Sequence, residues 1–191
     1  MVAVMPVETW DARFFTPDQA RVIGELLATV WPKPNVTAAD RAENLLALGR
    51  NYHGPDAQSP RSYVFMEDGM LLAHAAVIPR VITTSAGAIT MGGLARVCSD
   101  PQARGRGLGE LIARAALGAV DAGDFPWALF QTSQRVRPFY EKLGAVVVDN
   151  RIVNSLADNP AANPFWDEVV MRYPAGGDWP SGAIDLRGPG Y

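Results

Sequence analysis

The chain has 191 residues, of which 48% are hydrophobic and 19% are charged, and its formal net charge is −3. These values favour a globular protein, and the length predicts a single domain spanning residues 1–191. The slightly acidic balance argues against a nucleic-acid partner, because nucleic-acid-binding domains usually carry a basic face.

The cysteine content and the first residues indicate the compartment. Cys98 is the one cysteine of the chain, which excludes an intrachain disulfide and fits a reducing environment. The opening MVAVMPVETW lacks the basic and apolar regions of a secretory signal, and no apolar run is long enough to cross a bilayer. We therefore expect a cytoplasmic protein that has no membrane partner.

Two helices are predicted early in the chain. The first begins after Thr16, a candidate N-cap followed by proline, and ends at Pro32. The second begins with Thr37 and Asp40 at the spacing of a capping box, and Gly49 is its expected C-cap. A loop rich in turn-forming residues follows.

The middle of the chain has the pattern of strands. Residues 62–100 predict three strands, joined by a hairpin at Asp68-Gly69 and by a turn near 85–87. A helix is predicted from about Gly107 to Val120. The nearly continuous apolar run WALFQT, residues 127–132, then predicts a central strand.

The last third of the chain predicts one helix and two strands. Ser133 is a candidate N-cap for a helix over 134–144. Strands are expected in 145–154 and 165–174, and the tail beyond them shows no periodicity. The order of elements predicts an α+β (α/β layered) domain built around one mixed sheet.

Three glycines, Gly105, Gly107 and Gly109, alternate directly before the third predicted helix. Glycine lets the backbone approach a ligand closely, and the first amides of a helix have no partner within it. A phosphate or pyrophosphate suits such a site, with Arg104 and Arg106 adding positive charge. The alternative is a tight turn flanked by solvated arginines. The spacing matches neither a P-loop, which needs Lys followed by Ser or Thr, nor the dinucleotide fingerprint.

Two stretches carry a family resemblance. VCSDPQARGRGLGELI resembles motif A of the GCN5-related N-acetyltransferases (GNAT), with Arg104, Gly107 and Gly109 at its three fixed positions. SQRVRPFYEKLGA resembles motif B of the same superfamily, with Phe139 and Tyr140 followed by a glycine. The resemblance covers at least residues 60–150. It implies a mixed, mostly antiparallel central sheet flanked by helices, with splayed central strands.

The resemblance also implies a donor and the residues that hold it. The donor is acetyl-CoA, and no metal is implied. Backbone groups around Val97 and Ser99 would bind the pantetheine arm, which Ser133 would also contact. The pyrophosphate would lie on the backbone amides of a loop made of Arg104, Gly105, Arg106, Gly107, Leu108 and Gly109.

Proton transfer is the next requirement, because the amine must lose a proton and the departing thiolate must gain one. By resemblance Tyr140 is the proton donor, although its position also suits a core aromatic residue. Many relatives carry a glutamate on the strand before the loop, whereas this chain has Ala95 and Arg96 there. His74 is a candidate for the general base by its intrinsic pKa and a candidate for substrate binding, and its alternative is a packed histidine within a strand. The general base stays open, and Cys98 is expected in the core.

A narrower resemblance concerns the acceptor. LLAHAAVIPR is similar to a strand of the aminoglycoside 2′-N-acetyltransferases, and the tail from Asp178-Trp179 is similar to those enzymes and to the nodulation N-acyltransferases. By this resemblance Asp178 and Trp179 are acceptor candidates, since a carboxylate beside an indole suits an amino sugar. The alternative is an ordinary turn that closes the tail over the core.

The sequence therefore favours an N-acetyltransferase that moves an acetyl group from acetyl-CoA directly to a primary amine of a small molecule. An amino sugar or an aminoglycoside-like compound is the favoured acceptor. The alternatives are an N-acyltransferase with a longer acyl donor and a noncatalytic acyl-CoA-binding module. Dimers are common in the superfamily, so a homodimer is left open.

Overall fold

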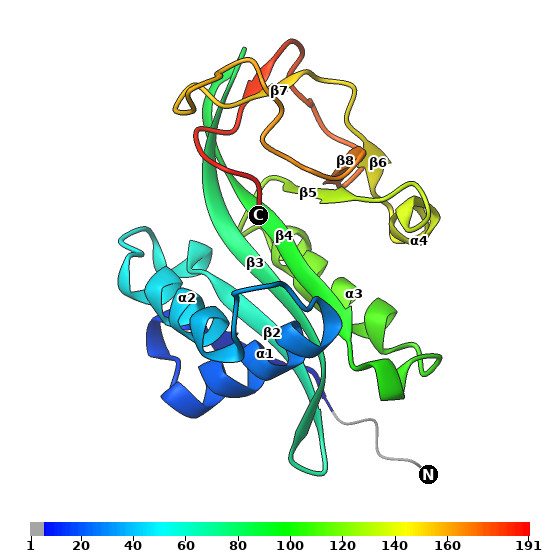
Figure 1. Cartoon of the computed structure of the whole chain (residues 1–191). Helices are drawn as coiled ribbons and strands as arrows, with labels where there is room; N and C mark the ends of the chain where they lie inside the picture. The colour runs from blue at the N-terminus through cyan, green and yellow to red at the C-terminus, as the bar shows by residue number, and fades with distance from the viewer. Residues whose placement is uncertain (1–5) are drawn as a thin grey trace. The chain divides into compact units, whose positions relative to one another are not determined.

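The structure is a computed structural model that describes residues 6–191. The chain separates into two compact units. The first unit contains the residues up to Ile78 together with Ala95–Gly118, and the second contains Pro79–Leu94 together with Ala119–Tyr191. Two long strands, β3 (Met70–Thr84) and β4 (Gly87–Ser99), contribute residues to both units (Figure 1). The single-domain expectation stays a prediction.

Two helices open the first unit, α1 (Pro17–Val30) and α2 (Ala38–Arg50), as the sequence predicts. Each begins with a complete capping box, Thr16 with Gln19 and Thr37 with Asp40. In both boxes the threonine hydroxyl accepts from the amide three residues on, and the side chain at that position accepts from the threonine amide.

The expected role of Gly49 is wrong. Helix α2 continues through Gly49 to Arg50, and Asn51 is the C-cap. A Cβ on Gly49 would lie 2.0 Å from the carbonyl oxygen of Ala12, in the short helix η1 (Ala12–Phe14). Gly49 is therefore needed for a close approach between two segments, whereas the helix ends beyond it.

Four strands form the sheet of the first unit, in the order β1-β2-β3-β4. Strand β1 (Glu8–Asp11) pairs antiparallel with β2 (Arg61–Glu67), which pairs antiparallel with β3. The turn between β2 and β3 is Asp68-Gly69, with φ of 49° and 77°, as the predicted hairpin requires. Two short 3₁₀ turns, η2 (Asp56–Gln58) and η3 (Pro101–Ala103), lie in the connecting loops.

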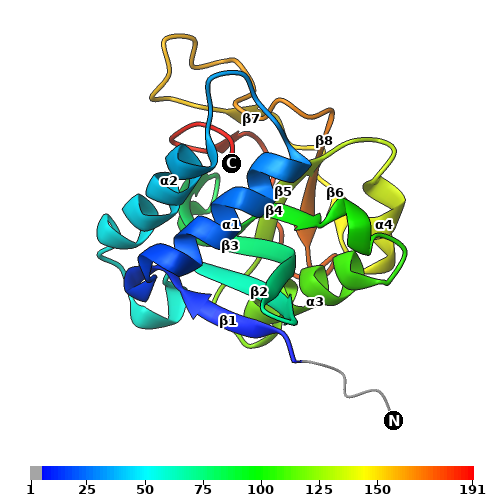
Figure 2. The same cartoon turned by 60° about the horizontal axis from the view of Figure 1, so that its bottom comes forward.

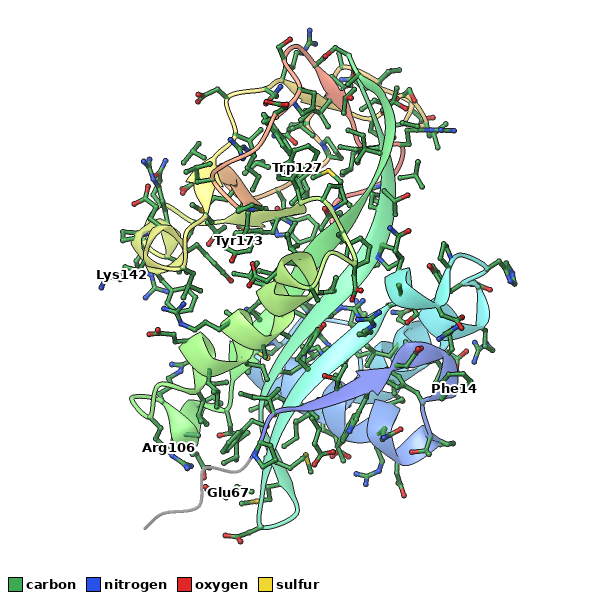
Figure 3. The ribbon with its side chains drawn as sticks, turned by 180° about the vertical axis from the view of Figure 1, so that it is seen from behind. Phe14, Glu67, Arg106, Trp127, Lys142 and Tyr173 are labelled. Carbon is green, nitrogen blue, oxygen red and sulfur yellow. The ribbon has the colours of Figure 1, made fainter. Side chains whose placement is uncertain are left out.

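Helices cover both faces of this sheet. Figures 1 and 2 show α1 and α2 side by side over β2 and β3, and Figure 3 shows α3 (Leu108–Asp121) on the opposite face. The core under α1 and α2 is formed by apolar side chains from the two helices and from three strands. Its fully or nearly fully buried members are Ala20, Ile23, Leu26, Leu27, Leu45, Val64, Leu71 and Cys98.

The second unit contains a short helix and small strands. Strand β5 (Ala128–Thr132) pairs parallel with β4 through Gly92–Ala128 and Gly93–Leu129, and pairs antiparallel with β8 (Val169–Tyr173). The sheet is thus mixed, and the α+β fold is confirmed. The parallel register between β4 and β5 is short, as expected for splayed central strands. The remaining elements are α4 (Arg137–Lys142), β6 (Val146–Val147), β7 (Ile152–Val153) and β9 (Ile184–Asp185).

The single strand expected over 145–154 is split. Strand β6 pairs antiparallel with β8, whereas β7 pairs parallel with β9 from the tail. The chain changes neighbours near Asn150, whose amide donates to the carbonyls of Pro180 and Gly182 at 2.9 and 2.7 Å. The tail that lacked any sequence periodicity therefore supplies a strand to this unit.

Candidate functional site

The glycine loop lies between η3 and α3, and residues 104–107 are exposed. Gly105 and Gly107 have φ of +81° and +76°, which side chains rarely adopt. A Cβ at either position, or at Gly109, would meet no atom within 4 Å. The glycines therefore leave open space in front of the backbone, which is what the close approach of a ligand requires.

The start of α3 directs unpaired amides into this loop. The first helical bond runs from the Leu111 amide to the Gly107 carbonyl at 3.1 Å, so the amides of residues 108–110 have no partner within the helix. The partial positive charge of the helix N-terminus favours an anion there. Leu108 has a buried side chain, so only its backbone is available to a ligand. The carboxylate of Glu110 is paired with Arg114 at 2.8 Å.

The two arginines of the loop differ in their partners. Arg106 donates from Nη1 and Nη2 to the two carboxylate oxygens of Glu67, at 2.9 and 2.7 Å, and the pair is visible in Figure 3. This bond lowers the pKa of Glu67 and fastens the loop to the β2–β3 hairpin. Arg104 is exposed and forms no ion pair with the residues that the structure describes. Arg104 is thus available to a ligand, whereas Arg106 is already engaged.

Val97 and Ser99 lie on the last part of β4, beyond the residues of that strand that pair with β5. Both are half-buried. Cys98 between them is buried in the core, as expected. Burial raises the pKa of its thiol to about 12, which keeps the sulfur protonated and unreactive.

His74 lies in a fully buried position on β3, and its assignment as a substrate-binding candidate stays a prediction. Its ring has no exposed surface, and both nitrogens are engaged: Nε2 with the Ser62 hydroxyl at 2.8 Å and Nδ1 with the Arg96 carbonyl at 3.0 Å. A carbonyl only accepts, so Nδ1 carries the proton and Nε2 accepts from Ser62. Burial lowers the pKa of His74 to about 4. A neutral His74 therefore holds the backbone of β4 at Arg96.

Arg96 and Arg41 are the residues of this region that sequence reasoning missed. Arg96 has φ of +56° within β4, an uncommon conformation for a residue with a side chain. Its Nη1 is buried, as is Nε of Arg41 on α2, and neither atom has a hydrogen-bond partner among residues 6–191. The available sequence signal was an arginine at a strand position where relatives carry an acid.

Tyr140 and Ser133 belong to the second unit. Tyr140 lies on α4 and is buried, with 7% of its surface exposed. Its ring centroid lies 4.6 Å from that of Phe130 and 4.9 Å from that of Phe139. Ser133 is not the side-chain N-cap of α4, which corrects that expectation. Its backbone carbonyl accepts from the amides of Val136 and Arg137, and α4 begins only at Arg137.

Asp178 and Trp179 are neighbours in the sequence but have different surroundings in the structure. Trp179 lines an open pocket of about 640 Å³ that Asn150 and Arg172 also line, whereas the exposed Asp178 does not line it. Nε1 of Trp179 donates to Asn150 at 2.6 Å, and the guanidinium of Arg172 lies 5.0 Å from the indole centroid. Arg172 therefore already occupies a position over the indole of Trp179, the ring that we expected to contact an amino sugar.

Within residues 6–191, no three His, Cys, Asp or Glu side chains are grouped in a way that could hold a metal ion. In the same part of the chain, no helix combines the length and the apolar character that spanning a bilayer requires.

Comparison with known proteins identifies the family. The family model described as Acetyltransferase (GNAT) domain matches residues 11–148. No curated protein matches the chain.

Solved structures support the same fold at low identity. An acetyltransferase of the GNAT family from Brucella melitensis, in complex with acetyl-CoA, is 16% identical with a TM-score of 0.59; the match covers 95% of this chain and 96% of that one. Glucosamine-6-phosphate N-acetyltransferase from Arabidopsis thaliana is 18% identical with a TM-score of 0.55. That match covers 73% of this chain and 90% of the Arabidopsis chain. A GCN5-related N-acetyltransferase from Kribbella flavida is 19% identical with a TM-score of 0.56. That match covers 77% of this chain and 35% of the Kribbella chain, so this chain spans about a third of that protein.

The family match covers well over half of the chain, and its fold and mixed sheet agree with these structures. The chain therefore belongs to the GNAT acetyltransferases, the acyl-CoA-dependent N-acetyltransferases.

Proposed function

We propose that this acetyltransferase uses acetyl-CoA to acetylate the primary amine of a small molecule by direct transfer. The observation that carries the proposal is the glycine loop before α3, where Gly105 and Gly107 have positive φ and every added Cβ would enter open space. Unpaired amides and a helix N-terminus make this a site for a pyrophosphate.

The residues present fit that donor. The amides of 104–109 would hold the pyrophosphate, and Arg104 would add charge from the loop's exposed side. Backbone groups of Val97 and Ser99 would bind the pantetheine arm, with Ser133 as a further contact. When bound, acetyl-CoA supplies an activated thioester carbonyl.

Transfer then requires two proton movements. The acceptor nitrogen attacks the thioester carbonyl and gives up a proton to water, and an amide of β4 stabilises the developing oxyanion. As the carbon–sulfur bond breaks, the hydroxyl of Tyr140 gives a proton to the sulfur. The ring of Tyr140 packs against those of Phe130 and Phe139, which would restrict the movement of its hydroxyl.

The favoured acceptor is an amino sugar. The Arabidopsis structure with the same fold is named for a phosphorylated amino sugar, which supports this class. Asp178 and Trp179 are acceptor candidates by the sequence resemblance. Trp179 has the additional support that it lines an open pocket.

The first test measures thiol release from acetyl-CoA with glucosamine, glucosamine 6-phosphate, amino acids, polyamines and aminoglycosides as acceptors. Tyr140→Phe should lower kcat about 10²-fold or more, because a positioned general acid contributes on that order. Its affinity for acetyl-CoA should stay within about twofold of the wild type, within the scatter expected for a change outside the binding contacts. Tyr52→Phe, which removes only a hydroxyl bond to the Pro55 carbonyl, is the matched control and should keep full activity.

The second test addresses the loop. Gly107→Ala and Gly87→Ala both place a methyl group at a positive φ with open space around it, so both should cost about 1–2 kcal/mol of stability. Gly107→Ala alone should raise the Kd for acetyl-CoA, by about tenfold or more in calorimetry. An unchanged Kd of Gly107→Ala for acetyl-CoA would contradict the assignment of the pyrophosphate to this loop.

A further inference from the structure

The feature that the proposed function leaves unused is the pair Arg41 and Arg96. Arg41 lies in the first turns of α2, and Arg96 lies on β4 directly before Val97. Both belong to the first unit, and both are half-buried. The positive charge of Arg41 is close enough to lower the pKa of Arg96, in addition to the larger effect of burial.

The surroundings of this pair lack a compensating acid. Nε of Arg41 and Nη1 of Arg96 are buried and bond to nothing within residues 6–191, and neither arginine forms an ion pair there. Arg41 reaches one partner, the Trp31 carbonyl, through Nη2. A buried N–H without an acceptor is costly, and two neighbouring guanidinium groups repel one another. An uncompensated pair of this kind is the arrangement expected where an external anion completes the hydrogen bonds.

The backbone of Arg96 adopts a conformation that costs conformational free energy. A φ of +56° at a non-glycine residue is strained and persists only where its surroundings impose it. Neutral His74 donates to the carbonyl of this residue while it accepts from buried Ser62. Two buried polar residues thus fix the backbone from which the Arg96 side chain extends.

We propose that Arg41 and Arg96 bind an anionic group, a carboxylate or a phosphate, carried by the acceptor amine. Guanidinium groups match both anions in charge and in planar hydrogen-bond geometry. The neighbouring residue, Val97, is part of the strand to which the proposed function assigns the pantetheine arm, so the inference rests on that function and deepens it. It narrows the acceptor to amino acids, phosphorylated amino sugars and related anionic amines, and it disfavours polyamines and aminoglycosides, which carry only positive charge.

The test compares acceptors in pairs that differ only in the anion: glycine with glycinamide, β-alanine with its amide, and glucosamine 6-phosphate with glucosamine. The wild type should prefer the anionic member of at least one pair by about tenfold or more in kcat/KM, equivalent to one well-made charged contact. Arg96→Gln and Arg41→Gln should reduce that preference to below about threefold by raising KM, and Arg96→Lys should restore part of it. Arg114→Gln, at an exposed arginine paired with Glu110, is the control and should change nothing.

Acetyl-CoA binding, measured by calorimetry, decides which substrate carries the anion. A Kd unchanged by Arg96→Gln assigns the anion to the acceptor, as proposed. A Kd raised about tenfold assigns it to the donor and overturns the inference. Equal rates with both members of every pair in the wild type overturn it as well.

A measurement without turnover separates this inference from the proposed function. In saturating acetyl-CoA, sodium phosphate and sodium acetate are compared with sodium chloride at equal ionic strength by thermal unfolding. A rise in Tm of the wild type with either anion, kept in Arg114→Gln and lost in Arg41→Gln and Arg96→Gln, supports the site even if no acceptor in the panel is acetylated. The absence of such a difference overturns the site whatever the activity. Without ligand, Arg96→Gln should melt at or above the wild-type Tm, because it removes a buried unpaired group, so misfolding would not explain a loss of binding.

Discussion

At the scale of single residues, His74 shows how burial assigns a role. The sequence presents a histidine with an ordinary pKa near pH 6.5, available for proton transfer. In the structure it is fully buried between the Ser62 hydroxyl and the Arg96 carbonyl, and its pKa falls to about 4. At neutral pH it is uncharged and serves as a hydrogen-bonding brace for β4.

This shift makes stability depend on pH. The pKa of His74 is lower in the folded state than in the unfolded state, so its contribution is fully present above about pH 6.5 and is lost as the pH falls toward 4. The complete loss amounts to about 3 kcal/mol. We expect the free energy of unfolding in urea to drop by roughly 2–3 kcal/mol more in the wild type than in His74→Gln between pH 7 and pH 4.5.

The control for this prediction is His53→Gln, at the second histidine of the chain, which is exposed. Its stability profile should parallel that of the wild type. Parallel profiles for the wild type and His74→Gln would instead mean that His74 titrates normally and does not brace the strand in its neutral form.

At the scale of elements, three helical glycines look alike in sequence and differ in their surroundings. A Cβ on Gly24 in α1 would lie 2.4 Å from the Ala38 carbonyl, and one on Gly49 in α2 would lie 2.0 Å from the Ala12 carbonyl. A Cβ on Gly118 in α3 would meet nothing within 4 Å. Gly24 and Gly49 permit close packing of backbone on backbone, whereas Gly118 only weakens its helix.

Alanine substitution should therefore act in opposite directions. Gly118→Ala should stabilise the protein by about 0.5–1 kcal/mol, because alanine loses less backbone entropy in a helix. Gly49→Ala should destabilise it by about 1–3 kcal/mol, because the packed backbone of η1 must move aside. Urea unfolding of the two variants gives the comparison, and a Gly49→Ala variant as stable as Gly118→Ala would contradict the close approach at Ala12.

At the scale of the whole molecule, the chain forms two compact units, and β3 and β4 supply residues to both. Each unit has its own buried core, around α1 and α2 in the first and around β5, β8 and the tail in the second. Because two long strands continue from one unit into the other, we expect the units to unfold together as one cooperative domain.

Tryptophans placed in both units allow this to be measured. Trp10 and Trp31 lie in the first unit, and Trp127, Trp166 and Trp179 lie in the second. In a Trp10→Phe/Trp31→Phe variant the fluorescence reports the second unit, and circular dichroism reports the whole chain. We expect coincident urea transitions and an equal shift of both when acetyl-CoA is added. Two separated transitions would divide the protein into independent domains.

Much of the fold was predictable because its signals are local. The starts of α1 and α2 follow from threonine caps with a partner three residues on, and the β2–β3 turn follows from an Asp-Gly pair that adopts positive φ. The glycine loop was predictable for the same reason, since alternate glycines before a helix determine which backbone conformations are open. Each signal depends on residues within one turn of the chain.

What the sequence alone determined is thus the family motifs, the element order and the position of the loop. Only the tertiary structure decided that Gly49 is a packing residue, that residues 145–154 divide between two neighbours, and that Arg41 and Arg96 each bury a nitrogen without a hydrogen-bond partner among residues 6–191. The physical reason is that burial, close approach and unpaired charge depend on which distant segment packs against a residue, and no local pattern carries that information.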